Sequence, residues 1–185
     1  MAATPSKMIT LGTLAPYFSI IDTVSEKMLS LTELKGRVAT VIMFICNHCP
    51  YVKHVNHELI RMAEEYIPKG INFIAISSND IIKYPDDGPN EMKKTASKLG
   101  YLFPYLFDES QQVAKAYDAA CTPDFYIYDV DLKLVYRGQL DDSRPGSNIP
   151  VTGKDIREAL QALLHNLPVP SIQKPSIGCN IKWKE

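Results

Sequence analysis

The chain has 185 residues, of which 45% are hydrophobic and 22% charged, and its formal net charge is −1. These values are typical of a globular protein with one core of moderate size. Because no block of basic residues is present, binding to nucleic acid or to an anionic membrane surface is not favoured. The longest apolar run, residues 38–45, is too short to span a bilayer.

The first half of the chain predicts a strand, a helix and a second strand. Residues 38–45 form a nearly continuous β-branched and aromatic run, typical of a strand buried on both faces. Apolar residues then recur at spacings of three and four as far as Tyr66, which predicts an amphipathic helix ended by Pro68 and Gly70. Residues 71–77 predict another buried strand. Such a unit is parallel and right-handed.

The middle of the chain predicts a loop and two short helices. Residues 79–90 are polar and contain prolines and a glycine, so we expect a loop there. A helix is expected over residues 91–99, before a glycine. A second is expected over residues 108–117, with Asp108 or Ser110 as its cap.

The last third predicts a hairpin, a helix and a tail. Residues 125–129 and 133–137 flank a polar turn and predict antiparallel strands. Residues 152–155 resemble a capping box and precede a helical apolar stripe. The tail from Pro168 contains further prolines, and we expect it to be extended.

Cysteine usage bears on the compartment. The N-terminal MAATPSKMITLG has no apolar stretch of signal-peptide length, so we expect a cytoplasmic protein. Four cysteines in 185 residues do not suggest a disulfide scaffold. In a reducing compartment, a Cys-x-x-Cys pair is more often catalytic or metal-binding than structural.

The stretch ICNHCPY places Cys46 and Cys49 where the first strand becomes the helix. On one helical turn, residues three apart share a face, so the two thiols can close a small ring. The positive helix N-terminus favours a thiolate on Cys46, whose pKa we expect below the free value of about 8.5. Asn47 and His48 can supply donors, and His48 can supply charge. Pro50 lies where a missing N–H costs little.

This order of elements, with Cys-x-x-Cys between the first strand and the helix, resembles the thioredoxin fold. A second motif supports the resemblance, because Cys121-Thr-Pro-Asp124 precedes the hairpin. Thioredoxin-like proteins carry a cis-proline there that packs beside the redox cysteines, and Pro123 with Thr122 before it fits that place. The resemblance implies a three-layer α/β/α domain with a mixed sheet.

Other segments resemble the peroxiredoxin-like branch of that superfamily, which includes AhpC/TSA proteins and thiol-disulfide reductases. Residues 12–18 resemble its opening Gly and Ala-Pro-x-Phe, and residues 31–36 its leucine-lysine-glycine step into the core strand. Residues 106–108 resemble the start of its later helix. The tail, residues 174–184, resembles that of an uncharacterised group of thioredoxin-family proteins.

We expect one domain over residues 1–185, and the resemblance covers about residues 12–164 of it. Its core spans about residues 36–165, with an N-terminal β-extension over residues 1–35 and an extended tail over residues 166–185. The implied activity is dithiol/disulfide exchange, with protein or small-molecule disulfides and thiols as partners. No cofactor is expected, because the thiols themselves hold the electrons. The sequence carries no signal for an oligomeric state.

In this interpretation Cys46 attacks, Cys49 resolves, and Pro123 lies beside them. The first alternative is an antioxidant thiol peroxidase with Cys49 or Cys46 as its peroxidatic cysteine. Peroxiredoxins place Pro-x-x-x-Thr-x-x before that cysteine. If Cys49 is matched to it, Cys46 stands in place of the Thr and Ile42 in place of the Pro. The family's arginine is also missing from residues 121–125, so disulfide exchange is favoured.

A second alternative is a Cys/His metal-binding or chaperone-like module. Cys46, Cys49, His54 and His57 are close in sequence, but both histidines belong to the helix face opposite the apolar stripe, so we expect them at the surface. His48 is the better ligand candidate. The sequence thus predicts no metal at these residues.

Two further cysteines are candidate additional thiols. Cys121 lies two residues before Pro123 and is expected to be a small buried residue at a strand start. Cys179 lies in the tail. It is either an extra resolving thiol, if the tail folds back, or a buried anchor.

Overall fold

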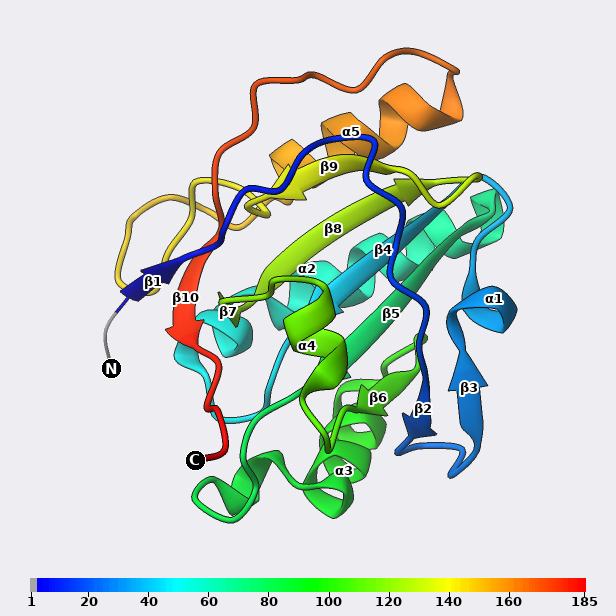
Figure 1. Cartoon of the computed structure of the whole chain (residues 1–185). Helices are drawn as coiled ribbons and strands as arrows, with labels where there is room; N and C mark the ends of the chain where they lie inside the picture. The colour runs from blue at the N-terminus through cyan, green and yellow to red at the C-terminus, as the bar shows by residue number, and fades with distance from the viewer. Residues whose placement is uncertain (1–2) are drawn as a thin grey trace.

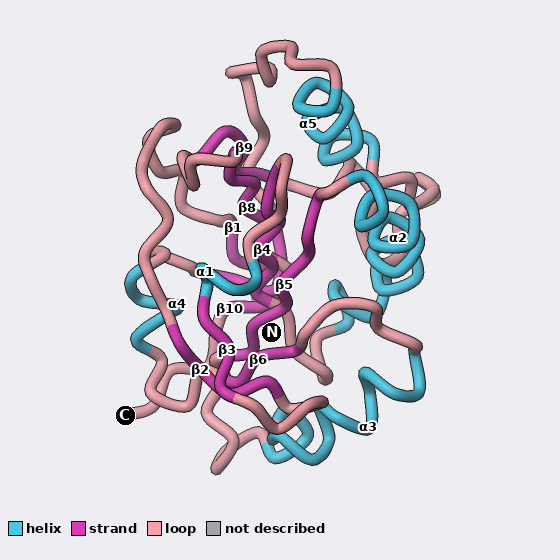
Figure 2. Tube along the Cα trace, turned by 90° about the vertical axis from the view of Figure 1, so that its right-hand side faces the viewer, coloured by secondary structure: helices cyan, strands magenta, loops and turns pink. Residues whose placement is uncertain are grey.

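The computed structural model describes residues 3–185, and a central sheet of seven strands lies between two layers of helices (Figure 1). Viewed along the sheet in Figure 2, α2, α3 and α5 cover one face and α1 and α4 the other. The strands are β1 (Ala3–Pro5), β2 (Ser19–Asp22), β3 (Met28–Ser30), β4 (Ala39–Phe44), β5 (Ile71–Ser77), β6 (Tyr105–Phe107), β7 (Cys121–Thr122), β8 (Asp124–Asp129), β9 (Leu134–Gly138) and β10 (Ile177–Asn180). The helices are α1 (Leu31–Leu34), α2 (Pro50–Tyr66), α3 (Pro89–Leu99), α4 (Gln112–Ala116) and α5 (Lys154–Leu164).

The large sheet has the order β3-β2-β6-β5-β4-β8-β9. Strand β4 is parallel to β5 and antiparallel to β8, and β8 forms a hairpin with β9. All six residues of β4 are buried, as the unbroken apolar run predicted. The expected mixed sheet in a three-layer fold is confirmed, and the N-terminal extension adds two antiparallel strands, β2 beside β6 and β3 at the edge.

Alternate side chains of the central strands pack into two separate apolar cores, one on each face of the sheet. Val41 and Met43 of β4 face α2, α3 and α5, whereas Ile42 and Phe44 face α1 and α4. Both cores are needed because the sheet is covered on both sides. Arg157 of α5 also forms ion pairs with α2, through Glu58 and Glu65.

The start of α2 differs from the prediction. The helix begins at Pro50, and Cys49 is its N-cap residue with an extended backbone, φ −67° and ψ 121°. Cys46 therefore lies in the loop between β4 and α2, not on the first helical turn. The reason is local, because proline is well suited to the first helical position and its ring disfavours helical geometry in the preceding residue.

Three other helix starts also differ from expectation. Helix α3 begins two residues early, at Pro89. Helix α4 begins at Gln112, and Asp108 instead accepts the Ala114 N–H at 2.9 Å. Helix α5 has Gly153 as its N-cap, with no capping side chain.

The tail folds back over the thiol-bearing end of the sheet. Its strand β10 pairs with β1 on one side and with β7 on the other, forming a three-stranded sheet. Figure 1 shows β10 crossing beside β7 and the start of α2. Within residues 3–185, no helix is both long and apolar enough to cross a membrane.

Candidate active site

Three sulfur atoms meet around Thr122. The Cys46 Sγ lies 3.4 Å from the Thr122 hydroxyl oxygen, and the Cys49 Sγ lies 3.2 Å from the Thr122 carbonyl oxygen. The Cys49 Sγ is also 2.8 Å from the Cys179 Sγ. All three cysteines are free thiols, and each is at most 1% exposed. The Thr122–Pro123 peptide bond is cis, as the resemblance implied.

Cys121 lies apart from this cluster. It is fully buried on β7, and within residues 3–185 the only hydrogen bond of its thiol is a weak one, 3.7 Å from Sγ to the Pro123 carbonyl oxygen. Burial raises the pKa of the Cys121 thiol, and the Asp124 carboxylate raises it further. Cys121 therefore fits the expected role of a small buried residue.

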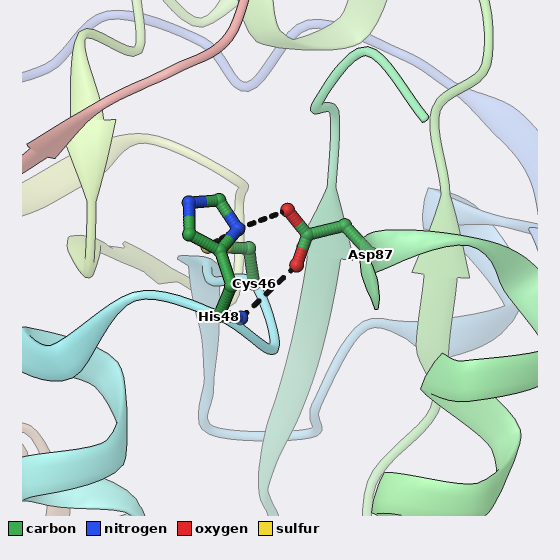
Figure 3. A group of neighbouring side chains, drawn as sticks. All are labelled: Cys46, His48 and Asp87. Atoms are coloured by element: carbon green, nitrogen blue, oxygen red, sulfur yellow. Dashed lines mark hydrogen bonds and ion pairs between the residues drawn. The ribbon is translucent and has the colours of Figure 1, made fainter. Parts of the chain in front are cut away.

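The other side of Cys46 is closed by His48 and Asp87 (Figure 3). The His48 Nδ1 is 3.9 Å from the Cys46 Sγ and 2.5 Å from an Asp87 carboxylate oxygen. The His48 ring stacks on Tyr84 with a centroid distance of 5.2 Å. Its side chain is 15% exposed, whereas Asp87, Thr122 and the three cysteines are buried.

Asp87 holds the loop between β4 and α2, and the sequence did not mark it as a site residue. It is fully buried, and one carboxylate oxygen accepts the backbone N–H groups of Asn47 and His48 at 2.8 and 3.1 Å. The other oxygen accepts the Asn79 amide at 2.8 Å as well as the His48 ring. The hydrogen bonds to His48 and Asn79 hold the pKa of Asp87 low, against its burial.

Asn79 links this loop to the tail. Its amide nitrogen donates to Asp87, and its amide oxygen accepts the Lys182 backbone N–H at 2.8 Å. Both Asn79 and Asp87 belong to the segment expected to be a featureless polar loop. No periodicity or motif in the sequence marks either residue, because their role depends on contacts between distant segments.

Of the two cysteines, Cys49 and not Cys46 has the lowered pKa, the reverse of the expectation. A hydrogen bond from the Cys46 thiol lowers the pKa of Cys49 to about 5, with further help from Cys179, Thr122 and the Val52 N–H. The same hydrogen bond, together with burial and the charge of Asp87, raises the pKa of Cys46. The expected low pKa of Cys46 is not supported, because the hydrogen bond shared with Cys49, burial and the Asp87 charge all favour its neutral thiol.

The residues do not fit a resident metal ion. In the described part of the chain, one group of His, Cys, Asp or Glu side chains lies close enough together to hold a metal ion. It consists of Cys46, His48 and Asp87, whose ligand atoms lie within 4.8 Å of one another. Both Asp87 oxygens already accept two hydrogen bonds each, so an ion would have to displace the donors that hold the loop.

His54, expected at the surface, is instead half-buried and lies 2.7 Å from the Ser143 hydroxyl.

A buried ion pair lies behind Pro123. Arg137 of β9 is fully buried and donates to Asp124 at 3.0 Å, and its guanidinium carbon lies 3.7 Å from the Tyr126 ring centroid. Burial raises the pKa of Asp124 to about 7, against the attraction of Arg137. This arginine is held by Asp124 and an aromatic face, and within residues 3–185 no hydrogen bond joins it to a thiol.

Comparison with known families agrees with this site. The profile of the AhpC/TSA family matches residues 11–137, more than half of the chain. The chain belongs to the AhpC/TSA family. Membership supports a redox function based on thiols. Among curated proteins, none matches the chain.

Solved structures match the whole fold. A crystal structure of an uncharacterized conserved protein from Geobacillus kaustophilus has 63% identity and a TM-score of 0.98, and the match covers 100% of this chain and 97% of that chain. A hypothetical protein from Sinorhizobium meliloti has 45% identity and a TM-score of 0.95, with 98% of both chains covered. The thioredoxin domain of a thiol-disulfide oxidoreductase from Bacteroides vulgatus has 18% identity and a TM-score of 0.60, covering 74% of this chain and 91% of that chain. The last match shows that the fold is thioredoxin-like.

The structure therefore brings together most of the residues singled out from the sequence. Cys46, Cys49, Thr122 and Cys179 form one cluster, and Pro123 follows Thr122 directly. Asn47 and His48 both bind Asp87, and His48 also lies beside the Cys46 sulfur. Pro50 begins α2.

Proposed function

We propose that the protein is a thiol-disulfide oxidoreductase in which Cys46 and Cys49 alternate between dithiol and disulfide. One observation carries the proposal: the Cys46 and Cys49 sulfur atoms both contact Thr122, at 3.4 Å from its hydroxyl and 3.2 Å from its carbonyl oxygen, beside the cis Thr122–Pro123 bond. Interaction with Cys46 also lowers the pKa of Cys49, which favours a thiolate next to a thiol in the reduced pair. A thiolate with a second thiol beside it is what dithiol exchange requires.

The first step is attack by Cys46 on a substrate disulfide. The Cys46 sulfur bonds to one substrate sulfur, its proton passes along the hydrogen bond to the Cys49 thiolate, and the second substrate sulfur leaves as a thiolate. Cys49 thereby acts as the base for Cys46, which compensates for the raised pKa of Cys46.

The second step releases the product. Cys49, on losing its proton, attacks the Cys46 sulfur, and the remaining substrate sulfur leaves as a thiolate. The single proton of the reduced pair passes from Cys46 through Cys49 to one substrate sulfur, and the other substrate sulfur takes its proton from solvent. Two electrons have then moved from the protein pair to the substrate. The reverse sequence oxidises a dithiol substrate.

Cys46 is proposed as the attacking residue because of what surrounds each sulfur. Cys49 is enclosed by Cys179 and the Thr122 carbonyl group. Cys46 instead borders His48, whose side chain is 15% exposed. A disulfide substrate can reach Cys46 by a shift of the His48 side chain away from Tyr84, without movement of a strand.

The proposed substrates are protein or small-molecule disulfides and dithiols, in a cytoplasmic setting. No further cofactor takes part in the steps above. Peroxide reduction is not favoured, because within residues 3–185 the buried Arg137 makes no hydrogen bond to a thiol, so it is not positioned to stabilise a peroxidatic thiolate.

The test is turnover of a model peptide disulfide with a small thiol as the final reductant. We expect Cys46→Ser and Cys49→Ser each to abolish measurable turnover, while Cys121→Ser retains it. Peroxide consumption is measured in parallel with the same four proteins. Unchanged disulfide turnover in Cys46→Ser contradicts the proposal, and Cys46-dependent peroxide turnover without disulfide turnover replaces it with the peroxidase alternative.

A further inference from the structure

The tail brings a third thiol to the pair and holds it there. Cys179 lies opposite Thr122 in the antiparallel pairing of β10 with β7, and its Sγ is 2.8 Å from that of Cys49. A disulfide bond length is about 2.0 Å. The two sulfur atoms can therefore bond after a movement of less than about 1 Å, without a change in the path of either backbone.

The position of Cys179 is fixed from both sides along the tail. The Ser176 hydroxyl donates to the Pro123 carbonyl oxygen at 2.7 Å, and the Lys182 N–H donates to Asn79 at 2.8 Å. Gly178 lies so close to β7 that an added Cβ would be 1.9 Å from the Thr122 carbonyl oxygen. A tail that only covered the site would not need this close approach of the two backbones.

We propose that Cys179 is a second resolving thiol, which takes over the disulfide from Cys46 and stores it as a Cys49–Cys179 bond. This inference rests on the proposed function, since it starts from the Cys46–Cys49 disulfide. The Cys179 sulfur attacks the Cys49 sulfur, the Cys46–Cys49 bond breaks, and Cys46 leaves as a thiolate that takes the Cys179 proton. No electron enters or leaves, so no additional oxidant is required.

Oxidation of the first pair itself prepares Cys179 for this attack. In the reduced site, burial raises the pKa of Cys179 to about 12, and both the hydrogen bond to Cys49 and the negative charge of Cys49 contribute. The charge on Cys49 disappears when the Cys46–Cys49 bond forms. Two of the causes that hold the proton on Cys179 are then lost, while the nearby Lys182 cation still favours its thiolate.

The consequence is protection of the stored disulfide. In the Cys46–Cys49 form, the bond borders the His48 side of the cluster, where small thiols can reach it. In the Cys49–Cys179 form, the bond lies between α2 and β10, on the side of Cys49 away from Cys46 and His48. External thiols then reduce the protein only after Cys46 has attacked Cys49 again.

The test is a disulfide map after brief oxidation by glutathione disulfide, followed by acid quench, alkylation of free thiols, proteolysis and mass spectrometry. We expect both Cys46–Cys49 and Cys49–Cys179 bonds in the wild type, only Cys46–Cys49 in Cys179→Ser, and Cys49–Cys179 in Cys46→Ser. Cys121→Ser should give the wild-type map. Gly178→Ala, which keeps the thiol but displaces β10, should lose most of the Cys49–Cys179 bond.

The outcomes separate this inference from the proposed function. A wild-type map with Cys46–Cys49 alone, together with a glutathione adduct on Cys49 in Cys46→Ser, overturns the third thiol and leaves the pair intact. Absence of Cys46–Cys49 in Cys179→Ser overturns the proposed function itself. Cys179→Ala repeats the comparison without the serine hydroxyl, and circular dichroism checks that each variant is folded. Reduction of the oxidised wild type by a small thiol should also be severalfold slower than that of Cys179→Ser, and equal rates contradict the protective storage.

Discussion

The two sides of the thiol cluster are built differently. On the Cys46 side, a loop is held by one buried carboxylate, Asp87, and the partly exposed His48 borders solvent. On the Cys49 side, a paired strand closes the site, and the sulfur contacts Cys179 and the Thr122 carbonyl oxygen. A loop can open by rotation of side chains, whereas a strand opens only when its backbone hydrogen bonds break.

This difference suggests a division of labour. In the proposed mechanism, the Cys46 side meets the substrate and the Cys49 side keeps the oxidised state. The Asn79 side chain joins the two sides, because it donates to Asp87 and accepts the backbone N–H of Lys182 in the tail. Changes on each side should therefore have distinct effects, with Asn79 as the connection between them.

The largest effect on stability is expected from loss of Asp87. The Asp87→Asn substitution keeps the shape but removes the charge and turns one acceptor into a donor that faces other donors. We expect the free energy of unfolding to fall by about 2–3 kcal/mol, as for buried hydrogen bonds to a charged group. Chemical denaturation measures the change. The exposed neighbour provides the control, since Asp86→Asn should stay within about 0.5 kcal/mol of wild type. Equal effects of the two substitutions would mean that Asp87 does not hold the loop.

On the strand side, we expect Gly178→Ala to lower the free energy of unfolding by about 2 kcal/mol, because its Cβ overlaps the Thr122 carbonyl oxygen and overpacking has costs of this size. The same substitution should speed alkylation of Cys49 in the reduced protein, since β10 is displaced. Ile177→Ala removes a partly exposed side chain from the same strand and serves as the matched control. Alkylation of Cys49 at the wild-type rate in Gly178→Ala would contradict the view that β10 closes this side.

A smaller effect is expected from Thr122→Val, which removes a hydroxyl of similar size to a methyl group. Thr122 lowers the pKa of Cys49, so its loss should raise the midpoint of the thiolate titration above about 5. Ultraviolet absorbance of the thiolate as a function of pH measures this midpoint, and Cys49→Ser identifies the signal. A midpoint that stays in place or falls would show that the hydroxyl does not stabilise the thiolate.

The same pKa determines how the stability of the reduced protein depends on pH. The folded pKa of Cys49, about 5, lies below the unfolded value of about 8.5. The thiolate therefore stabilises the folded state fully above the unfolded pKa, and this contribution is lost as pH falls through about 5. Denaturation of wild type and Cys49→Ser at several pH values should show the difference between them shrink over that range.

The sequence predicted the elements whose signal is local. The bounds of β5 match the predicted residues 71–77, because an unbroken apolar run between a glycine and a polar loop marks both ends. The cis Thr122–Pro123 bond and the three-layer fold followed from resemblance. The start of α2 was not predicted correctly. A shift of a few residues decides whether Cys46 or Cys49 lies at the helix N-terminus.

The sequence could not predict the features that depend on distant contacts. Asp87 contacts the Cys46 loop across about forty residues, and Cys179 reaches Cys49 across 130. Neither contact leaves a periodic pattern in the chain. The tail was expected to be extended, and its sequence gives no indication that it pairs with β7.

The most direct test of the central claim is a redox titration of Cys179→Ser in glutathione buffers, with alkylation of Cys46 and Cys49 measured separately. The proposed function predicts that both thiols become unreactive in one two-electron transition, with a tenfold change in the equilibrium constant for every ~30 mV. The disulfide that forms should join Cys46 to Cys49. Independent titration of the two thiols, or a lasting glutathione adduct on either one, would contradict the claim that they form a redox pair.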